Sequence, residues 1–209
     1  MSTAGKKHLT IALAGNANVG KSVIFNYLTG LHQHIGNWPG KTVEKAEGTL
    51  HFKGRTIDVL DLPGIYSLSA FSIEERISRE YIATEKPDVV INIVDASALE
   101  RNLFFTLQLL ELETPMIMAL NQVDVAKAKG ITIHVPELQK SLGIPVIPTI
   151  ATRIKGLGKL LDKAVKVAKG KKLPKPARYG REIEEKIREV TKLVEKISVQ
   201  YPPRWVAIK

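Results

Sequence analysis

The chain has 209 residues, of which 44% are hydrophobic, and it contains no cysteine. This composition supports a folded core and excludes a disulfide framework, a cysteine-ligated zinc site and a thiol nucleophile. The formal net charge is +10, but residues 166–209 alone hold 13 Lys and Arg against five Glu. The sequence has no signal-peptide pattern and no apolar run of the ~18 residues that a membrane span needs, so we expect a soluble chain.

The first 170 residues alternate between predicted strands and helices. Short apolar or extended runs predict six strands, at residues 8–15, 49–52, 56–60, 89–94, 116–120 and 144–150. Periodicity and capping signals predict helices at residues 23–30, from the capping box at Ser72 to before Pro87, at 99–113, after Pro136, and at 157–168. The predicted fold is α/β: a mostly parallel six-stranded sheet with one antiparallel edge strand and helices on both faces.

The C-terminal part has a different pattern. Residues 171–180 are rich in Lys, Pro and Gly and predict a linker. Apolar side chains then recur at helical spacing from Ile183 to Ile197, and Pro203 suits the first turn of another helix. We therefore expect a main domain at 1–170, a linker at 171–180, and the truncated start of a helical domain at 181–209.

A glycine-rich motif lies between the first predicted strand and the first predicted helix. Residues 15–22 read GNANVGKS and match G-x-x-x-x-G-K-[ST], which in this context is typical of a phosphate-binding P-loop. Backbone N–H groups and the helix N-terminus would surround the phosphates. Lys21 would reach the β- and γ-phosphates, and Ser22 would offer its hydroxyl to Mg²⁺.

A second motif, DLPG at residues 61–64, ends the predicted hairpin. The Asp61 carboxylate can hold Mg²⁺, usually through water, and the Gly64 N–H can meet a γ-phosphate. The motif is weak alone, but it gains weight because it lies about 40 residues after the P-loop, at the carboxyl end of a strand, where ligands bind in such sheets.

A third motif, NQVD at residues 121–124, follows the fifth predicted strand. The Asp124 carboxylate can accept hydrogen bonds from N1–H and the 2-amino group of guanine, which adenine does not offer. Asn121 would tie this loop to the P-loop. Together the three motifs predict a guanine-nucleotide-binding domain. Gln122 replaces the usual lysine that packs on the base, and Ala151 stands in Ile-Ala-Thr instead of Ser-Ala-Lys, although its N–H can still reach guanine O6.

Residues 34–44 are polar and rich in glycine, and they occupy the place of the first switch loop of a GTPase. Thr42 is the candidate threonine that closes over Mg²⁺ when the γ-phosphate is present. An exposed tryptophan in a mobile loop would be unusual, so we predict that Trp38 is a buried anchor.

At this point the sequence resembles the N-terminal G domain of the ferrous-iron transport protein B family, FeoB. The resemblance rests on residues 15–22, on GNWPGKTVE at 36–44 and on DLPGIYSL at 61–68. It implies a Ras-like P-loop GTPase that hydrolyses GTP slowly on the cytoplasmic face of the membrane. It also implies a membrane permease joined through the helical domain, no nucleic-acid partner, and a possible homo-oligomer.

The resemblance further implies a potassium ion held by Asn18 and by backbone carbonyls near Gly36 and Trp38, beside the Mg²⁺ that Ser22, Thr42 and Asp61 would hold. The catalytic candidates are Lys21, Thr42 and Gly64. The candidate nucleotide-binding residues are Gly15, Asn16, Ala17, Asn18, Val19, Gly20, Lys21, Ser22, Val23, Gly40, Lys41, Thr42, Asp61, Leu62, Pro63, Gly64, Asn121, Gln122, Asp124 and Ala151.

The residue after D-x-x-G bears on mechanism. Ras-type enzymes place a glutamine there to orient the attacking water, whereas this chain has Ile65, which cannot hydrogen-bond water. Switch backbone groups, Thr42 or another residue must then position the water, and a bound monovalent cation could supply positive charge where charge develops on the phosphate.

Two other functions compete with a transporter-linked GTPase. An RNA-associated GTPase of ribosome or tRNA maturation would explain the basic tail, but that tail lacks the aromatic or glycine-rich contact motifs expected of an RNA module. A nucleotide-binding scaffold without hydrolysis gains support only from Ile65.

Overall fold

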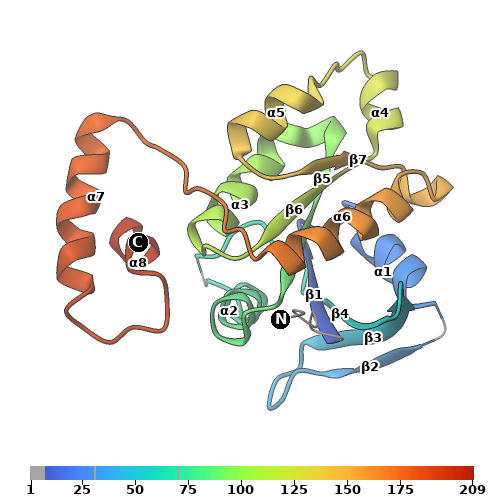
Figure 1. Ribbon diagram of the computed structural model, residues 1–209, viewed down its shortest axis with the longest axis horizontal. Helices are drawn as coiled ribbons and strands as arrows, with labels where there is room; N and C mark the ends of the chain where they lie inside the picture. The colour runs from blue at the N-terminus through green and yellow to red at the C-terminus, as the bar shows by residue number, and fades with distance from the viewer. Residues whose placement is uncertain (1–7, 31, 70) are drawn as a thin grey trace, which may run out of the picture.

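The computed structural model describes residues 8–30, 32–69 and 71–209. A seven-stranded sheet in the order β2-β3-β4-β1-β5-β6-β7 lies at its centre (Figure 1). β4, β1, β5, β6 and β7 are parallel, while β3 runs antiparallel to both of its neighbours. The strands are β1 (His8–Gly15), β2 (Gln33–Asn37), β3 (Glu44–Phe52), β4 (Arg55–Asp61), β5 (Val89–Asp95), β6 (Met116–Asn121) and β7 (Val146–Pro148).

Helices cover both faces of the sheet, as predicted. The α-helices are α1 (Lys21–Thr29), α2 (Ile73–Glu80), α3 (Leu99–Glu111), α4 (Val123–Ala128), α5 (Val135–Leu142), α6 (Leu157–Gly170), α7 (Arg181–Val194) and α8 (Pro203–Ile208). Shorter turns are η1 (Tyr81–Glu85), η2 (Ala96–Ala98) and η3 (Ala151–Arg153). One buried cluster joins the sheet to α1 and α6, and the other joins it to α3 and η1.

The side chains of β5 show why this segment folds as a central strand. Ile91 and Ile93 point into the α1 and α6 cluster, while Val90 and Val94 point into the α3 cluster. Such a strand needs apolar residues on both faces. The exception, Asn92, is fully buried, and its amide donates to Thr106 Oγ1 of α3 at 2.7 Å.

The α/β fold is confirmed, but the sheet has seven strands and not six. The additional strand is β2, which begins the segment expected to be the switch loop, and β3 begins at Glu44 and not at Thr49. β2 pairs with β3 through backbone hydrogen bonds at the sheet edge, where polar side chains can remain in water. Gly48 allows the chain before β2 to pass close by, since a Cβ there would lie 2.6 Å from the His32 carbonyl oxygen.

Other boundaries differ in smaller ways. β7 covers only three residues of the strand predicted at 144–150, and α4 was not predicted. The predicted capping of α2 is confirmed: Ser72 Oγ accepts a hydrogen bond from the Glu75 N–H at 3.1 Å, and the Glu75 carboxylate accepts one from the Phe71 N–H at 3.0 Å.

The last two helices stand to one side of the sheet domain, beyond a segment at 171–180 that contains no helix or strand (Figure 1). Along the predicted apolar stripe of α7, Ile187 and Val194 are buried, whereas Ile183 and Val190 are exposed. Trp205 of α8 is 6% exposed and packs into the α3 cluster. Within the described part of the chain, every helix falls short of the length and apolarity that crossing a bilayer requires.

Candidate nucleotide-binding site

The P-loop connects β1 to α1 with the strained backbone that its glycines allow. Gly20 has φ +90°, and a Cβ there would lie 2.4 Å from Asn121 Nδ2. A Cβ on Gly15 would lie 2.5 Å from the Ile93 carbonyl oxygen. Asn18 has φ 65°, a left-handed conformation that asparagine tolerates. The loop therefore needs glycine at both ends of the motif.

Lys21 and Asp61 come together at the carboxyl ends of β1 and β4. The Lys21 ammonium pairs directly with the Asp61 carboxylate, and both side chains are 11% exposed. Burial raises the pKa of Asp61, and the charge of Lys21 opposes that rise. Gly64 lies against the P-loop, because a Cβ there would be 3.2 Å from Ala17 Cα. The first two motifs thus form one site.

Asn121 ties the NQVD loop to the P-loop, as predicted, and it also contacts the loop after β7. Its amide nitrogen donates to the Val19 carbonyl at 2.9 Å, and its amide oxygen accepts from the Ala151 N–H at 2.9 Å and from Thr149 Oγ1 at 3.1 Å. The Ala151 N–H therefore donates to Asn121 in this structure, and its contact with guanine O6 stays a prediction.

Gln122 reaches back from the NQVD loop to the P-loop. Its backbone is left-handed, with φ 60°, and its side-chain amide donates to the Asn18 carbonyl at 3.2 Å. Asp124 lies in the first turn of α4, with its carboxylate 4.0 Å from the Arg153 guanidinium of η3. Arg153 was missed by sequence reasoning. The one available signal was a basic residue just after the Ile-Ala-Thr loop.

The switch segment is tied to α2 and η1. The Trp38 ring packs edge-on against Tyr81, with centroids 5.7 Å apart, but the residue is only half-buried. The prediction that Trp38 is an anchor is confirmed by this packing, and the prediction that it is buried is wrong in extent. Lys41 lies 3.6 Å from Glu80. Thr42 is exposed and lies just before β3. Because β3 runs antiparallel to β4, this places Thr42 near the carboxyl end of β4, at the same edge of the sheet as the P-loop. Among the described residues no hydrogen bond joins Thr42, Gly36 or Trp38 to the P-loop.

The remaining predicted residues divide by burial. Leu62 and Val19 have core side chains, so only their backbone can serve a ligand. Asn16 is 3% exposed, and neither polar atom of its side chain has a partner in the described chain. Ala17, Ser22, Val23, Gly40, Pro63 and Gly64 are exposed or half-buried around the site. Ile65 is 3% exposed in the core, which removes its side chain from any contact with water at the site.

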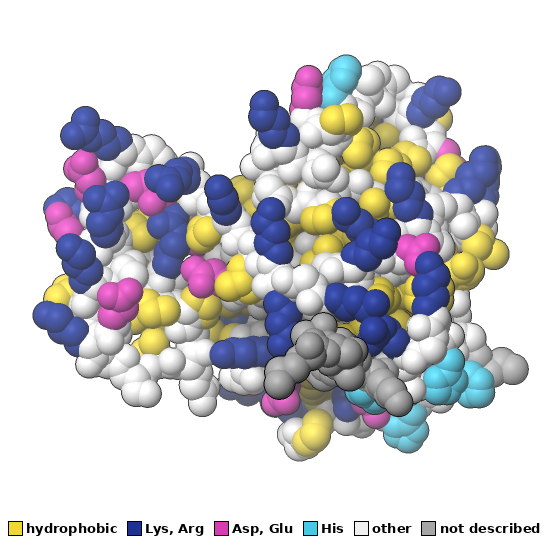
Figure 2. Space-filling view, viewed as in Figure 1, with side chains coloured by type: hydrophobic (Ala, Val, Ile, Leu, Met, Phe, Trp, Pro, Cys, Tyr) yellow, Lys and Arg dark blue, Asp and Glu magenta, His cyan; other side chains and the backbone are white. Residues whose placement is uncertain are grey.

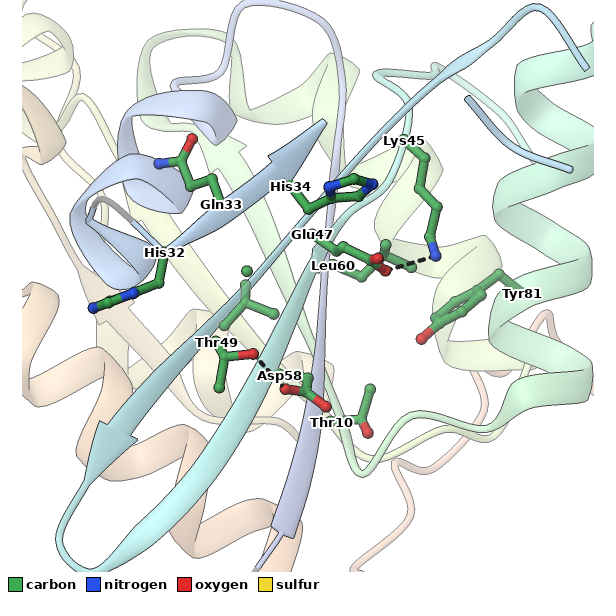
Figure 3. A pocket seen from close by; sticks show the side chains of 12 residues that line it. Thr10, His32, Gln33, His34, Lys45, Glu47, Thr49, Asp58, Leu60 and Tyr81 are labelled. Atoms are coloured by element: carbon green, nitrogen blue, oxygen red, sulfur yellow. Dashed lines mark hydrogen bonds and ion pairs between the residues drawn. The ribbon is translucent and has the colours of Figure 1, made fainter. Parts of the chain in front are cut away.

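A separate polar cavity of about 610 Å³ lies on the open face of β3 and β4 (Figure 3). Thr49 Oγ1 donates to the Asp58 carboxylate at 2.8 Å, and Lys45 pairs with Glu47 at 2.6 Å. Burial, with the nearby acids, raises the pKa of Tyr81 to about 12. Among the described residues, those that line this cavity include no group of three or more His, Asp or Glu side chains that could hold a metal ion.

The site fits a nucleoside polyphosphate with Mg²⁺. Gly15, Gly20 and Gly64 let the P-loop and the DLPG loop pack closely, because a Cβ at any of them would meet atoms of a neighbouring segment. Lys21 brings a cation to this loop, whose backbone N–H groups can surround phosphates. Ser22 and Asp61 offer the oxygen ligands that Mg²⁺ prefers. With the sheet order and the NQVD loop, these features define the chain as a P-loop GTPase domain of Ras-like fold.

Comparisons with known proteins identify the family. The sequence-family model described as Ferrous iron transport protein B matches residues 9–164, and the family model described as FeoB cytosolic helical domain matches residues 179–209. The chain belongs to the ferrous iron transport protein B family.

Relatives and solved structures agree with this assignment. An Fe(2+) transport protein A/Fe(2+) transporter FeoB fusion protein of Porphyromonas gingivalis is 42% identical over 208 residues, which is 96% of this chain and 25% of the relative. The Fe(2+) transporter FeoB of Escherichia coli K12 is 48% identical over 155 residues, 72% of this chain and 20% of the relative. The crystal structure of the cytosolic domain of the T. maritima FeoB iron transporter in a GDP form is 41% identical with a TM-score of 0.90, covering 98% of this chain and 80% of that one. The chain thus spans 20% to 25% of these curated relatives.

Proposed function

We propose that this chain binds GTP and GDP with Mg²⁺ and hydrolyses GTP, as the regulatory module of a ferrous-iron transporter. The observation that carries the proposal is the convergence of Lys21, Asp61 and Asn121, from three separate motifs, at one edge of the sheet. The T. maritima relative, whose structures include GDP and GMPPNP forms, supports the same ligand class.

In this proposal each motif binds a different part of the nucleotide. P-loop N–H groups and Lys21 hold the phosphates, and Ser22, Thr42 and Asp61 hold the metal. Asp124 accepts hydrogen bonds from guanine, while Asn121 keeps its loop against the P-loop. When bound, Mg²⁺ neutralises part of the negative charge on the phosphate oxygens.

We propose a slow hydrolysis that potassium stimulates. Ile65 is buried and cannot orient water. The attacking water is therefore positioned by the Gly64 N–H, by switch backbone groups and by Thr42. Asn18 is exposed at the P-loop, and its amide oxygen is a neutral ligand suited to a monovalent cation. A cation there would stabilise charge that develops on the phosphates.

We further propose the division into a G domain at 1–170, a linker at 171–180 and the start of a helical domain at 181–209. In the full-length protein this module would lie on the cytoplasmic face of the membrane, joined to a permease domain, with homo-oligomerisation possible. The RNA-associated alternative is not favoured, since both family models and the relatives belong to FeoB.

The test is GTP hydrolysis by the purified chain. Lys21→Ala should abolish measurable turnover while the fold, followed by circular dichroism, is retained. Lys186→Ala, an exposed lysine of α7, serves as the matched control and should hydrolyse GTP at the wild-type rate. Wild-type turnover in a folded Lys21→Ala variant would refute the assignment.

A further inference from the structure

The outward face of α6 consists almost entirely of lysine. Lys159, Lys163 and Lys166 follow one another at intervals of four and three residues, so they share one face of the helix. Lys155 precedes the helix, and Lys169 follows Lys166 by one turn. All five are exposed, and Figure 2 shows lysine and arginine side chains spread across the front of the molecule, where α6 lies. We call these five residues the α6 lysine face.

The charges of the α6 lysine face are not neutralised by any residue that the structure describes. The one acidic residue of α6, Asp162, pairs with Lys53 of the β3–β4 hairpin. Among the described residues no carboxylate lies within 4.0 Å of any lysine of this face, although other exposed cations, such as Arg181 and Lys186, have acidic partners. Like charges three or four residues apart oppose the helix by a few tenths of a kcal/mol per pair. A partner of opposite charge would relieve that repulsion.

A cleft beside α6 extends the basic surface. It has a volume of about 470 Å³, and lysines line it from three segments: Lys140 of α5, Lys163 and Lys166 of α6, and Lys172 of the following loop. Apolar side chains, including Ile144 and Val167, also line the cleft, and Leu173 beside them is 51% exposed. Cations around an apolar lining match the charged headgroups and upper acyl region of a lipid surface.

We propose that the α6 lysine face and this cleft dock on the surface of an anionic phospholipid bilayer. This inference rests on the proposed function in one respect: the proposed link to a membrane permease would hold the chain close to a membrane. Anionic headgroups attract clustered lysines without requiring a fixed register. RNA is the less suitable partner, because residues 155–175 contain no aromatic side chain on which unstacked bases could pack.

The test is co-sedimentation of the 209-residue chain with vesicles, without nucleotide. Vesicles of phosphatidylcholine mixed with phosphatidylglycerol are compared with vesicles of phosphatidylcholine alone, at low and at physiological salt. The test variant changes Lys159, Lys163 and Lys166 to Gln. The matched control removes the same charge from α7 by changing Arg188, Lys192 and Lys196 to Gln, all of them exposed and none with an acidic partner among the described residues.

The chain should bind the anionic vesicles and not the neutral ones, and binding should weaken as salt rises. Each lysine at such a surface contributes about a five-fold factor, so the α6 variant should partition at least ~20-fold more weakly, while the α7 control loses far less. Equal binding to both kinds of vesicle, equal losses in the two variants, or α6-dependent binding to RNA without binding to anionic vesicles would overturn the proposal. GTP hydrolysis, assayed separately, tests the proposed function on its own.

Discussion

Arg204 Nε donates to Glu111 Oε2 at 3.0 Å, and this bond joins α8 to the last residue of α3. The Glu111 side chain is 3% exposed and that of Arg204 is 19% exposed. Arg204 also donates two bonds of 2.9 Å to Glu184 of α7, and the Tyr179 hydroxyl donates to Glu111 at 3.0 Å. Among the described residues, Arg204 is therefore the one cation that pairs with the buried Glu111 carboxylate.

Removing Arg204 should destabilise the fold. Arg204→Ala leaves Glu111 buried without its cation, so we expect the free energy of unfolding to fall by about 3 kcal/mol. Arg181→Ala is the control, because Arg181 is 92% exposed and its pair with Glu185 is worth less than about 0.5 kcal/mol. Urea unfolding of both variants measures the difference, and equal effects would show that the Glu111 pair is not a stabilising contact.

Acid should weaken the same cluster through Glu184. Hydrogen bonds from Arg204 lower the pKa of Glu184 to about 2, from an ordinary value of 4.5. A carboxylate with a lowered pKa stabilises the fold above its unfolded pKa, and that contribution is lost as the pH falls toward 2. Wild type should therefore lose more unfolding free energy than Glu184→Gln between about pH 5 and about pH 2. Parallel pH profiles would contradict this. Burial raises the pKa of Glu111, which acts in the opposite direction in both proteins.

The parallel part of the sheet could be predicted because its strands, such as β5, are apolar on both faces. β2 could not, since its polar residues pair through backbone groups and its position depends on the close approach at Gly48. Strand formation at an edge depends on a neighbour that the local pattern does not reveal.

The candidate site divides in the same way. Lys21, Asp61 and Asn121 could be predicted because their chemistry and spacing point to phosphate, metal and loop contacts. The bond from Gln122 to the Asn18 carbonyl could not, because it depends on left-handed backbone at both residues. The approach of Arg153 to Asp124 could not be predicted either, because these two residues are far apart in sequence and the tight turn of η3 places Arg153.

Guanine specificity should depend on Asp124. Asp124→Asn removes a charged acceptor, so affinity for GDP should fall by at least ~2 kcal/mol. Xanthosine diphosphate is the matched ligand: its C2 carbonyl can accept from the new amide, so the variant should bind it better than wild type does. Calorimetry with both nucleotides provides the measurement, and unchanged GDP affinity would remove Asp124 from the site.

Thr42 should matter for hydrolysis more than Ile65 does. Ile65 is 3% exposed in the core, so Ile65→Val costs about 1 kcal/mol of stability and leaves the site unchanged. Thr42→Ala should slow single-turnover hydrolysis by about 10-fold or more, because it removes a hydroxyl that acts on the metal. Thr42→Ser keeps that hydroxyl and should retain most of the rate. The reverse ranking of the Thr42 and Ile65 variants would assign the water-positioning role elsewhere.

Potassium should raise turnover relative to sodium at equal ionic strength, and the effect should depend on Asn18. Its side-chain oxygen is a hard neutral ligand, and its backbone has φ 65°. Asn18→Gly is therefore a better test variant than Asn18→Ala. Glycine adopts this left-handed conformation, so the backbone carbonyl that accepts from Gln122 stays in place while the side-chain ligand is removed. Asn26→Ala, an exposed asparagine further along α1, is the control and should keep the potassium effect.

The expected cation site also requires the switch loop to approach the P-loop. Gly36 lies in β2 opposite Lys45 of β3, and we expect this end of the hairpin to move toward Asn18 when the site forms. A GTP-bound or transition-state-like complex should favour that movement, because the γ-phosphate draws the switch inward. Potassium should therefore tighten binding of a non-hydrolysable GTP analogue more than binding of GDP. Equal hydrolysis rates of wild type in the two salts would discard the cation site and leave the GTPase assignment intact.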